Sequence, residues 1–71
     1  MQLDNIYFID VSGGKAFAGR KAFTGIYKGR RKDRGEEFMV FIDWFNPKWA
    51  WVVRPHEVTK SRDATTSFRL R

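Results

Sequence analysis

The chain has 71 residues, of which 42% are hydrophobic and 17% aromatic, so we expect one small folded domain rather than a disordered tail. Fourteen Lys and Arg against eight Asp and Glu give a net charge of +6. Cysteine is absent and His56 is the single histidine, which excludes disulfide bonds, thiolate zinc sites and multi-histidine metal sites.

No apolar run approaches the roughly 20 residues of a membrane-spanning helix. The N-terminal segment MQLDNIYFID carries acids where a signal peptide has a basic start. We therefore expect a cytoplasmic protein that does not contact a membrane.

The first half of the chain predicts two strands. Residues 5–11 are rich in β-branched and aromatic side chains and stop at a Ser-Gly-Gly signal, which is typical of a strand followed by a turn. Residues 15–20 are too short for a regular helix and predict a loop or one helical turn. Residues 21–31 alternate loosely between two faces, and Gly25 indicates a bulge or sharp bend. We expect a second, bent strand here.

The most polar segment of the chain is followed by its most apolar strand. Residues 30–35 lie between two strand-like runs and predict a hairpin loop. Residues 36–45 would carry on one face Phe38, Val40, Ile42 and Trp44, and on the other Met39, Phe41 and Phe45. We expect Phe38, Ile42 and Trp44 to belong to the core. A strand that is apolar on both faces is either enclosed or presents one face to a partner.

The last part of the chain predicts a fourth and a short fifth strand. Asn46-Pro47 is a turn signal, and residues 48–53 predict a strand that projects Trp49, Trp51 and Val53 together. Pro55 ends this strand, and residues 58–60 would form the fifth.

Four to five antiparallel strands without a long helix predict an all-β domain over residues 1–60. Because a single hairpin is not stable alone, we expect the strands to close into a small barrel. Residues 61–71 show little periodicity and predict a mobile basic tail, although its Phe68 and Leu70 could dock.

Three segments carry a resemblance to a known superfamily: FTGIY at residues 23–27, the hairpin around residues 30–35, and VVRPHEV at residues 52–58. Their order resembles the SH3-like small barrels, which include the KOW and Tudor modules and the DNA-binding C-terminal domains of retroviral integrases. The resemblance implies a short proline-containing helical turn before the last strand. Locally, WFN at residues 44–46 followed by WAWVV at residues 49–53 is similar to cold-shock domains, whose aromatic side chains stack on single-stranded bases.

The cations are concentrated in two parts of the chain. Residues 13–34 carry eight Lys and Arg against one Asp, and residues 54–71 carry five against two acids. Such clustering favours a polyanion as partner, whereas the alternative is a solvated surface that keeps a small apolar domain soluble. The polyanion hypothesis requires the cations to lie on one side of the fold without being neutralised by neighbouring acids.

The candidate nucleic-acid-binding set combines basic and aromatic side chains. Its members are Lys21, Lys28, Arg30, Arg31, Lys32, Arg34, Lys48, Trp49, Trp51 and Arg54. The basic side chains would grip phosphates, and Trp49 and Trp51 would either stack on bases or belong to the core. Lys15 and Arg20 could extend this surface. Asp43 would face outwards or pair with a base such as Lys48 or Arg54.

The leading hypothesis is a non-enzymatic nucleic-acid-binding module, with duplex DNA favoured over RNA. The alternative is a protein-interaction module, either a homodimer through residues 36–45 or an adaptor or inhibitor of an acidic host protein, as encoded by a phage or mobile element. No serine, cysteine or histidine arrangement typical of catalysis is present in the sequence. We therefore expect no enzyme activity, no cofactor and no small-molecule substrate.

Overall fold

The computed structural model describes residues 1–12 and 19–69. In chain order the elements are β1 (Ile6–Val11), β2 (Ala22–Asp33), β3 (Glu36–Asp43), β4 (Ala50–Val53), the 3-10 helix η2 (Pro55–Glu57), β5 (Val58–Asp63) and α1 (Thr65–Arg69). A loop or helical turn was expected over residues 15–20, and residues 15–18 of it lie outside the described residues.

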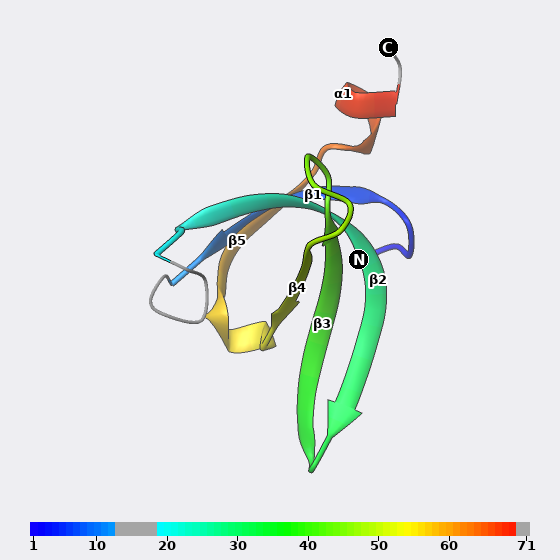
Figure 1. Cartoon of the computed structure of the whole chain (residues 1–71). Coiled ribbons are helices and arrows are strands. Elements are labelled where there is room, and N and C mark those ends of the chain that lie inside the picture. The colour runs from blue at the N-terminus through cyan, green and yellow to red at the C-terminus, as the bar shows by residue number, and fades with distance from the viewer. Residues whose placement is uncertain (13–18, 70–71) are drawn as a thin grey trace.

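All five strands belong to one antiparallel sheet in the order β4-β3-β2-β1-β5 (Figure 1). This arrangement confirms the expected all-β class. The edge strands β4 and β5 are consecutive in the chain and are joined through η2, where Pro55 ends β4 as predicted. The strand pairing does not by itself confirm closure into a barrel.

The core lies against one face of the sheet, and we call the opposite face the outer face. The side chains that meet in the core are Tyr7, Ile9, Val11, Phe23, Tyr27, Met39, Phe41, Trp51 and Val53. The rings of Phe23 and Trp51 stack with their centroids 5.0 Å apart and their planes 14° apart. Aromatic packing thus supplies much of the apolar area that a domain of this size needs to bury.

The face of β3 that enters the core is the opposite of the one expected. Met39 and Phe41 are buried, while Phe38 and Ile42 lie on the outer face and are only half-buried. Register explains the difference, because Phe41 pairs with Trp51 and side chains of paired residues share a face. Both faces of β3 are apolar, so the sequence pattern alone could not choose between them.

The β2–β3 connection is shorter than expected. Asp33 pairs directly with Glu36, so the turn consists of Arg34 and Gly35, which have φ angles of +51° and +80°. Two successive positive φ angles are typical of the tight turns that match the twist of a hairpin. Residues 30–33 therefore belong to β2, and their side chains alternate between its two faces.

Of the bulge or sharp bend that the sequence predicted at Gly25, the strand register excludes the bulge. The register shifts instead between Tyr27 and Arg30, around Gly29. At Gly25 a Cβ atom would lie 2.9 Å from the Cβ of Phe41, which is closer than two carbon atoms can approach. The glycine leaves room for the Phe41 side chain between neighbouring strands.

The sheet continues past the boundary expected at residue 60. Strand β5 runs to Asp63 and pairs with β1, and the short helix α1 follows. The Thr65 hydroxyl accepts a hydrogen bond of 2.8 Å from the Ile6 N–H. Phe68 docks on the Phe8 ring, with the centroids 5.6 Å apart. The segment predicted as a mobile tail is thus part of the fold as far as Arg69, and Leu70 lies outside the described residues.

Candidate nucleic-acid interface

The structure divides the predicted set between the two ends of β3 (Figure 1). The hairpin end carries Arg30, Arg31, Lys32, Arg34 and, beside β3, Arg54. The other end carries Lys21, Lys48, Trp49 and Trp51, and Lys28 lies between, at the β2 bulge. The eight residues of β3 separate the two ends by roughly 25 Å at about 3.3 Å per residue. The ten residues therefore do not form one patch.

Part of the basic set is neutralised by neighbouring acids. Arg30 Nη1 lies 3.0 Å from a carboxylate oxygen of Glu37, which raises the Arg30 pKa. Arg54 Nε lies 3.0 Å from Glu36, and its guanidinium sits 5.3 Å above the Phe38 ring. Lys28 pairs likewise with Asp4 at 2.6 Å. All three pairs are exposed, where such pairs stabilise by only about 0–1 kcal/mol, so a phosphate could replace the carboxylate.

Three cations at the hairpin remain without an ion pair among the described residues: Arg31, Lys32 and Arg34. They lie on a two-stranded segment, residues 30–38, that we call the ribbon. Between the Arg31–Phe38 pair and the turn, the two strands of the ribbon pair only with each other. Strand β4 begins to pair with β3 only at Met39. Figure 1 shows the ribbon extending beyond the rest of the sheet.

The two tryptophans of the predicted set differ in accessibility. Trp51 is 5% exposed and belongs to the core, so its ring is not available to stack on a base. Trp49 is 50% exposed, and the edge of its ring contacts Trp51, with the centroids 5.7 Å apart. Of the two alternatives left open by the sequence, the core assignment is correct for Trp51.

The sequence predicted that Asp43 faces outwards or pairs with a base such as Lys48 or Arg54, and the structure shows neither arrangement in the part of the chain that it describes. Asp43 is buried, and its carboxylate accepts three hydrogen bonds of 2.9 Å: from the N–H groups of Phe45 and Asn46, and from Trp51 Nε1. Burial by itself would raise the Asp43 pKa. The hydrogen bonds outweigh burial and, with the charge of Arg20, lower the pKa below its ordinary value. Asp43 thereby fixes the start of the β3–β4 loop.

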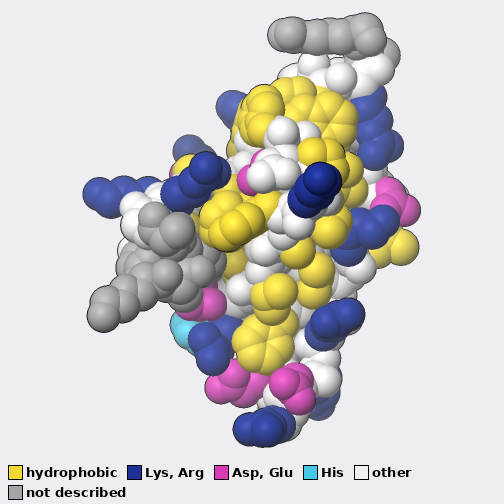
Figure 2. All heavy atoms as spheres, viewed as in Figure 1, with side chains coloured by type: hydrophobic (Ala, Val, Ile, Leu, Met, Phe, Trp, Pro, Cys, Tyr) yellow, Lys and Arg dark blue, Asp and Glu magenta, His cyan; other side chains and the backbone are white. Residues whose placement is uncertain are grey.

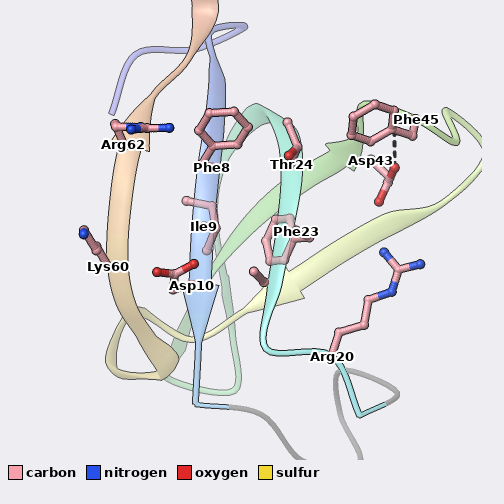
Figure 3. Close-up of a pocket in the computed structure, with 11 residues that line it drawn as sticks. Phe8, Ile9, Asp10, Arg20, Phe23, Thr24, Asp43, Phe45, Lys60 and Arg62 are labelled. Carbon is pink, nitrogen blue, oxygen red and sulfur yellow. Dashed lines mark hydrogen bonds between the residues drawn. The ribbon is translucent and has the colours of Figure 1, made fainter.

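A second cluster of cations lies on the outer face, in a hollow of about 540 Å³ that we call the outer groove (Figure 3). The side chains that define it are Phe8, Asp10, Arg20, Phe45, Lys60 and Arg62. The Arg62 guanidinium sits 4.8 Å above the Phe8 ring, and the Arg20 guanidinium sits 5.6 Å from the Trp51 ring.

The sequence pattern did not indicate this groove, because Arg62 falls in the segment expected to be a tail and Lys60 is not among the candidate binding residues. Pairing of β5 with β1 places Lys60 opposite Asp10 and Arg62 opposite Phe8. The available signal was the alternation of Lys60 and Arg62 with smaller residues, which would have placed both on one face of a strand.

The cations as a whole do not gather on one side, as the polyanion hypothesis required. Figure 2 shows Lys and Arg side chains at many places around the visible face, with acids among them at the hairpin end. That requirement is not met by the set as a whole. Cations without an ion pair among the described residues lie on two smaller surfaces, the ribbon and the outer groove, and only these local surfaces still favour a polyanion as partner.

Among residues 1–12 and 19–69, no group of three or more His, Cys, Asp or Glu side chains is placed to hold a metal ion. No helix in this part of the chain is long and apolar enough to cross a membrane. Comparisons with protein-family models, with curated proteins and with solved structures found no match for the chain.

Proposed function

We propose that this chain is a non-enzymatic nucleic-acid-binding module that inserts its β2–β3 ribbon into a groove of duplex DNA. The observation that carries the proposal is the ribbon itself, which projects from the sheet and bears Arg31, Lys32 and Arg34 without an ion pair among the described residues. Phosphates would be the ligands of these cations, because Lys and Arg supply most of the sequence-independent affinity for DNA.

The shape of the ribbon favours DNA over RNA. The major groove of B-DNA is about 12 Å wide and admits a two-stranded β-ribbon, whereas the major groove of duplex RNA is deep and narrow. Side chains that alternate along a strand point to opposite faces, so Arg31 lies on one face and Lys32 on the other. Inside a groove, the two cations would point toward opposite phosphate backbones.

The acids of the hairpin fit a module of moderate affinity. Glu37 and Glu36 hold Arg30 and Arg54 in exposed ion pairs, from which both arginines can be released to a phosphate. Asp33, on the ribbon beside the turn, adds a repulsive charge. We therefore expect the three unpaired cations to dominate the affinity.

We also propose that the fold is an SH3-like barrel. The strand order, with β5 returning to pair with β1, and the 3-10 helix η2 at Pro55 between β4 and β5 support this assignment. The nucleic-acid proposal does not depend on it, because one small fold can serve many functions.

The test is a titration of the whole chain with duplex DNA, single-stranded DNA and duplex RNA at several salt concentrations. The wild-type chain should bind duplex DNA best, and the logarithm of its affinity should fall with log[salt] by about 0.9 per phosphate contacted. The variant R31A/K32A/R34N should flatten this slope by up to about 2.7, the value for three contacts. Asn is chosen at position 34 because it tolerates the φ angle of +51°.

The matched control is K21A/K28A/K48A, which removes the same charge away from both the ribbon and the outer groove. If electrostatic attraction of the whole molecule governed binding, both variants would flatten the slope equally. The proposal is lost if affinity responds neither to salt nor to the ribbon variant, or if the control has the larger effect.

A protein-interaction module is the second candidate, and exposed apolar side chains favour it. On the outer face Val52 is 54% exposed beside the half-buried Val40, and Trp49 in the adjoining loop is 50% exposed. A second copy of the chain or an acidic host protein would cover them. A complex that survives both nuclease treatment and high salt, or a dimer in sedimentation that Val52→Lys dissociates, would support this candidate over the first.

A further inference from the structure

We propose that the outer groove is a separate binding site for one or two unpaired nucleotides of a single strand. One base would stack on Phe45, and the flanking phosphates would lie among Arg20, Lys60 and Arg62. The inference adds a second site to the proposed function. Its tests rest on groove variants and on a short single-stranded probe, with the ribbon variant as a comparison, so either proposal can fail without the other.

The cations of the groove come from two separate parts of the chain. Lys60 and Arg62 project from β5, and Arg20 precedes β2 and extends toward the Asp43 carboxylate, beyond which Phe45 lies (Figure 3). Among the described residues none of the three takes part in an ion pair. The groove therefore presents three cations outside any ion pair, although Asp10 lies opposite Lys60 and the charge of Arg20 acts on the Asp43 carboxylate.

Two of these cations are held by aromatic rings. Arg62 lies above Phe8 at 4.8 Å and Arg20 lies 5.6 Å from Trp51. A guanidinium that stacks on a ring keeps its N–H edge free, and that edge is the part that binds phosphate bidentately. These arginines are thus restrained before a ligand arrives, which lowers the entropic cost of binding.

Phe45 supplies an open ring surface at the same groove. It is 74% exposed, the most exposed of the large hydrophobic side chains among the described residues. Its backbone is fixed because its N–H donates to the buried Asp43 carboxylate at 2.9 Å. An exposed aromatic ring beside cations is the combination that binds single-stranded nucleic acid, where bases stack and phosphates pair with Lys and Arg.

The volume of the groove and the presence of Asp10 restrict which ligands fit it. A volume of about 540 Å³ is within the range of roughly 300–1,000 Å³ of small-ligand pockets, so it suits a nucleotide unit and not a duplex. An acidic peptide would satisfy the cations but leave Phe45 uncovered. Asp10 lies opposite Lys60 in the strand register, where it opposes anions and limits affinity.

The experiment is an NMR titration of the labelled whole chain with three probes: a short oligothymidylate, an abasic oligomer with the same number of phosphates, and an oligoglutamate peptide. Oligothymidylate should shift the amide signals of β1 and β5 at the groove and leave those of the ribbon unchanged. It should bind more tightly than the other two probes, because only thymidylate adds base stacking.

Four variants separate the contributions. Phe45→Ala should weaken oligothymidylate binding by about 5- to 150-fold, the effect of losing one stacked base, and leave the abasic oligomer unaffected. Lys60→Gln and Arg62→Gln should weaken both nucleic-acid probes. Asp10→Asn should strengthen both, because it removes a repulsive charge without changing the side-chain shape. The NMR spectrum of each free variant reports whether it is folded.

Specific outcomes would overturn the inference. Equal binding of thymidylate and the abasic oligomer would reduce the groove to an anion site, and equal binding of oligoglutamate would assign it to acidic peptides. Loss of thymidylate binding in R31A/K32A/R34N, with no loss in the groove variants, would place single-strand binding on the ribbon. Loss in the groove variants with unchanged duplex affinity would support the groove as a second site.

Discussion

The ribbon and the outer groove each present three cations without an ion pair among the described residues, but they hold them differently. The ribbon cations are adjacent in the sequence and surround a tight turn, with exposed acids between them. The groove cations Arg20, Lys60 and Arg62 come from two distant parts of the sequence. Aromatic rings and the buried Asp43 carboxylate lie beside them. Charge that is clustered in the sequence can therefore be exposed and partly screened, whereas charge that is dispersed in the sequence can be assembled over a packed surface.

The largest expected effect is on the free energy of unfolding, in a comparison of the buried Asp43 beside the groove with the exposed Glu37 of the ribbon. Asp43→Asn should lower the free energy of unfolding by about 2–3 kcal/mol, because an amide has one oxygen and leaves at least one buried N–H donor unpaired. Glu37→Gln, which removes an exposed ion pair, should cost less than about 1 kcal/mol. Chemical denaturation measures both.

Equal costs for these two substitutions would contradict the structural distinction between the two regions. Trp51→Phe removes one of the donors, so Asp43→Asn should cost less in that background than in the wild-type chain.

A smaller effect compares a glycine in the body of the sheet with one in the ribbon turn. Gly25→Ala should destabilise the fold by about 1–3 kcal/mol, because the new Cβ would collide with the Phe41 side chain and the Ile42 carbonyl. Gly35→Ala meets no neighbouring atom but must adopt a φ of +80°, at a cost of about 1–2 kcal/mol.

Asn at each of these positions sharpens the comparison. Gly35→Asn should be nearly neutral, since Asn tolerates a positive φ, whereas Gly25→Asn should be at least as harmful as Gly25→Ala. If Asn rescued both positions, steric crowding at Gly25 would not be the cause of its effect.

The smallest expected effect is the dependence of stability on pH. The pKa values of Asp43 and Asp63 are lowered in the folded chain: at Asp43 because hydrogen bonds outweigh burial, and at Asp63 chiefly because the Thr65 backbone N–H donates to its carboxylate. The stability that these carboxylates contribute is complete above their unfolded pKa of about 3.9. It should be lost progressively as the pH falls from about 4 through the lower folded pKa values.

Denaturation curves recorded at successive pH values test this expectation. The decline in the free energy of unfolding below about pH 4 should be shallower in Asp43→Asn and in Asp63→Asn than in the wild-type chain. An unchanged decline in both variants would show that other carboxylates are responsible for it.

Structural features that depend only on residues adjacent in the sequence could be predicted from it. The β-branched and aromatic run of residues 5–11 forms β1, and Pro55 ends β4 because it lacks an N–H donor and fixes its φ angle. The apolar residues of segment 36–45 correctly indicated a strand. Both faces of that strand are apolar, so there was no basis in the sequence for choosing Phe41 over Phe38 as the core residue.

The candidate site was predictable only in part, for the same reason. The hairpin cations are neighbours in the sequence, so their shared position could be inferred, although the alternation of β2 divides them between two faces. The groove could not be inferred, because Arg62 reaches Phe8 only through the pairing of β5 with β1. The role of Asp43 likewise depends on Trp51, which lies on the next strand.

The sequence by itself determined the all-β class, most of the strands and the excess of positive charge, because these follow from the local preferences of side chains and from composition. Only the tertiary structure decided which face of β3 is buried, which cations meet acids, and that Arg20, Lys60 and Arg62 share one groove. The physical reason is strand register. Pairing between distant segments fixes which side chains share a face, and a shift of one residue would exchange the faces.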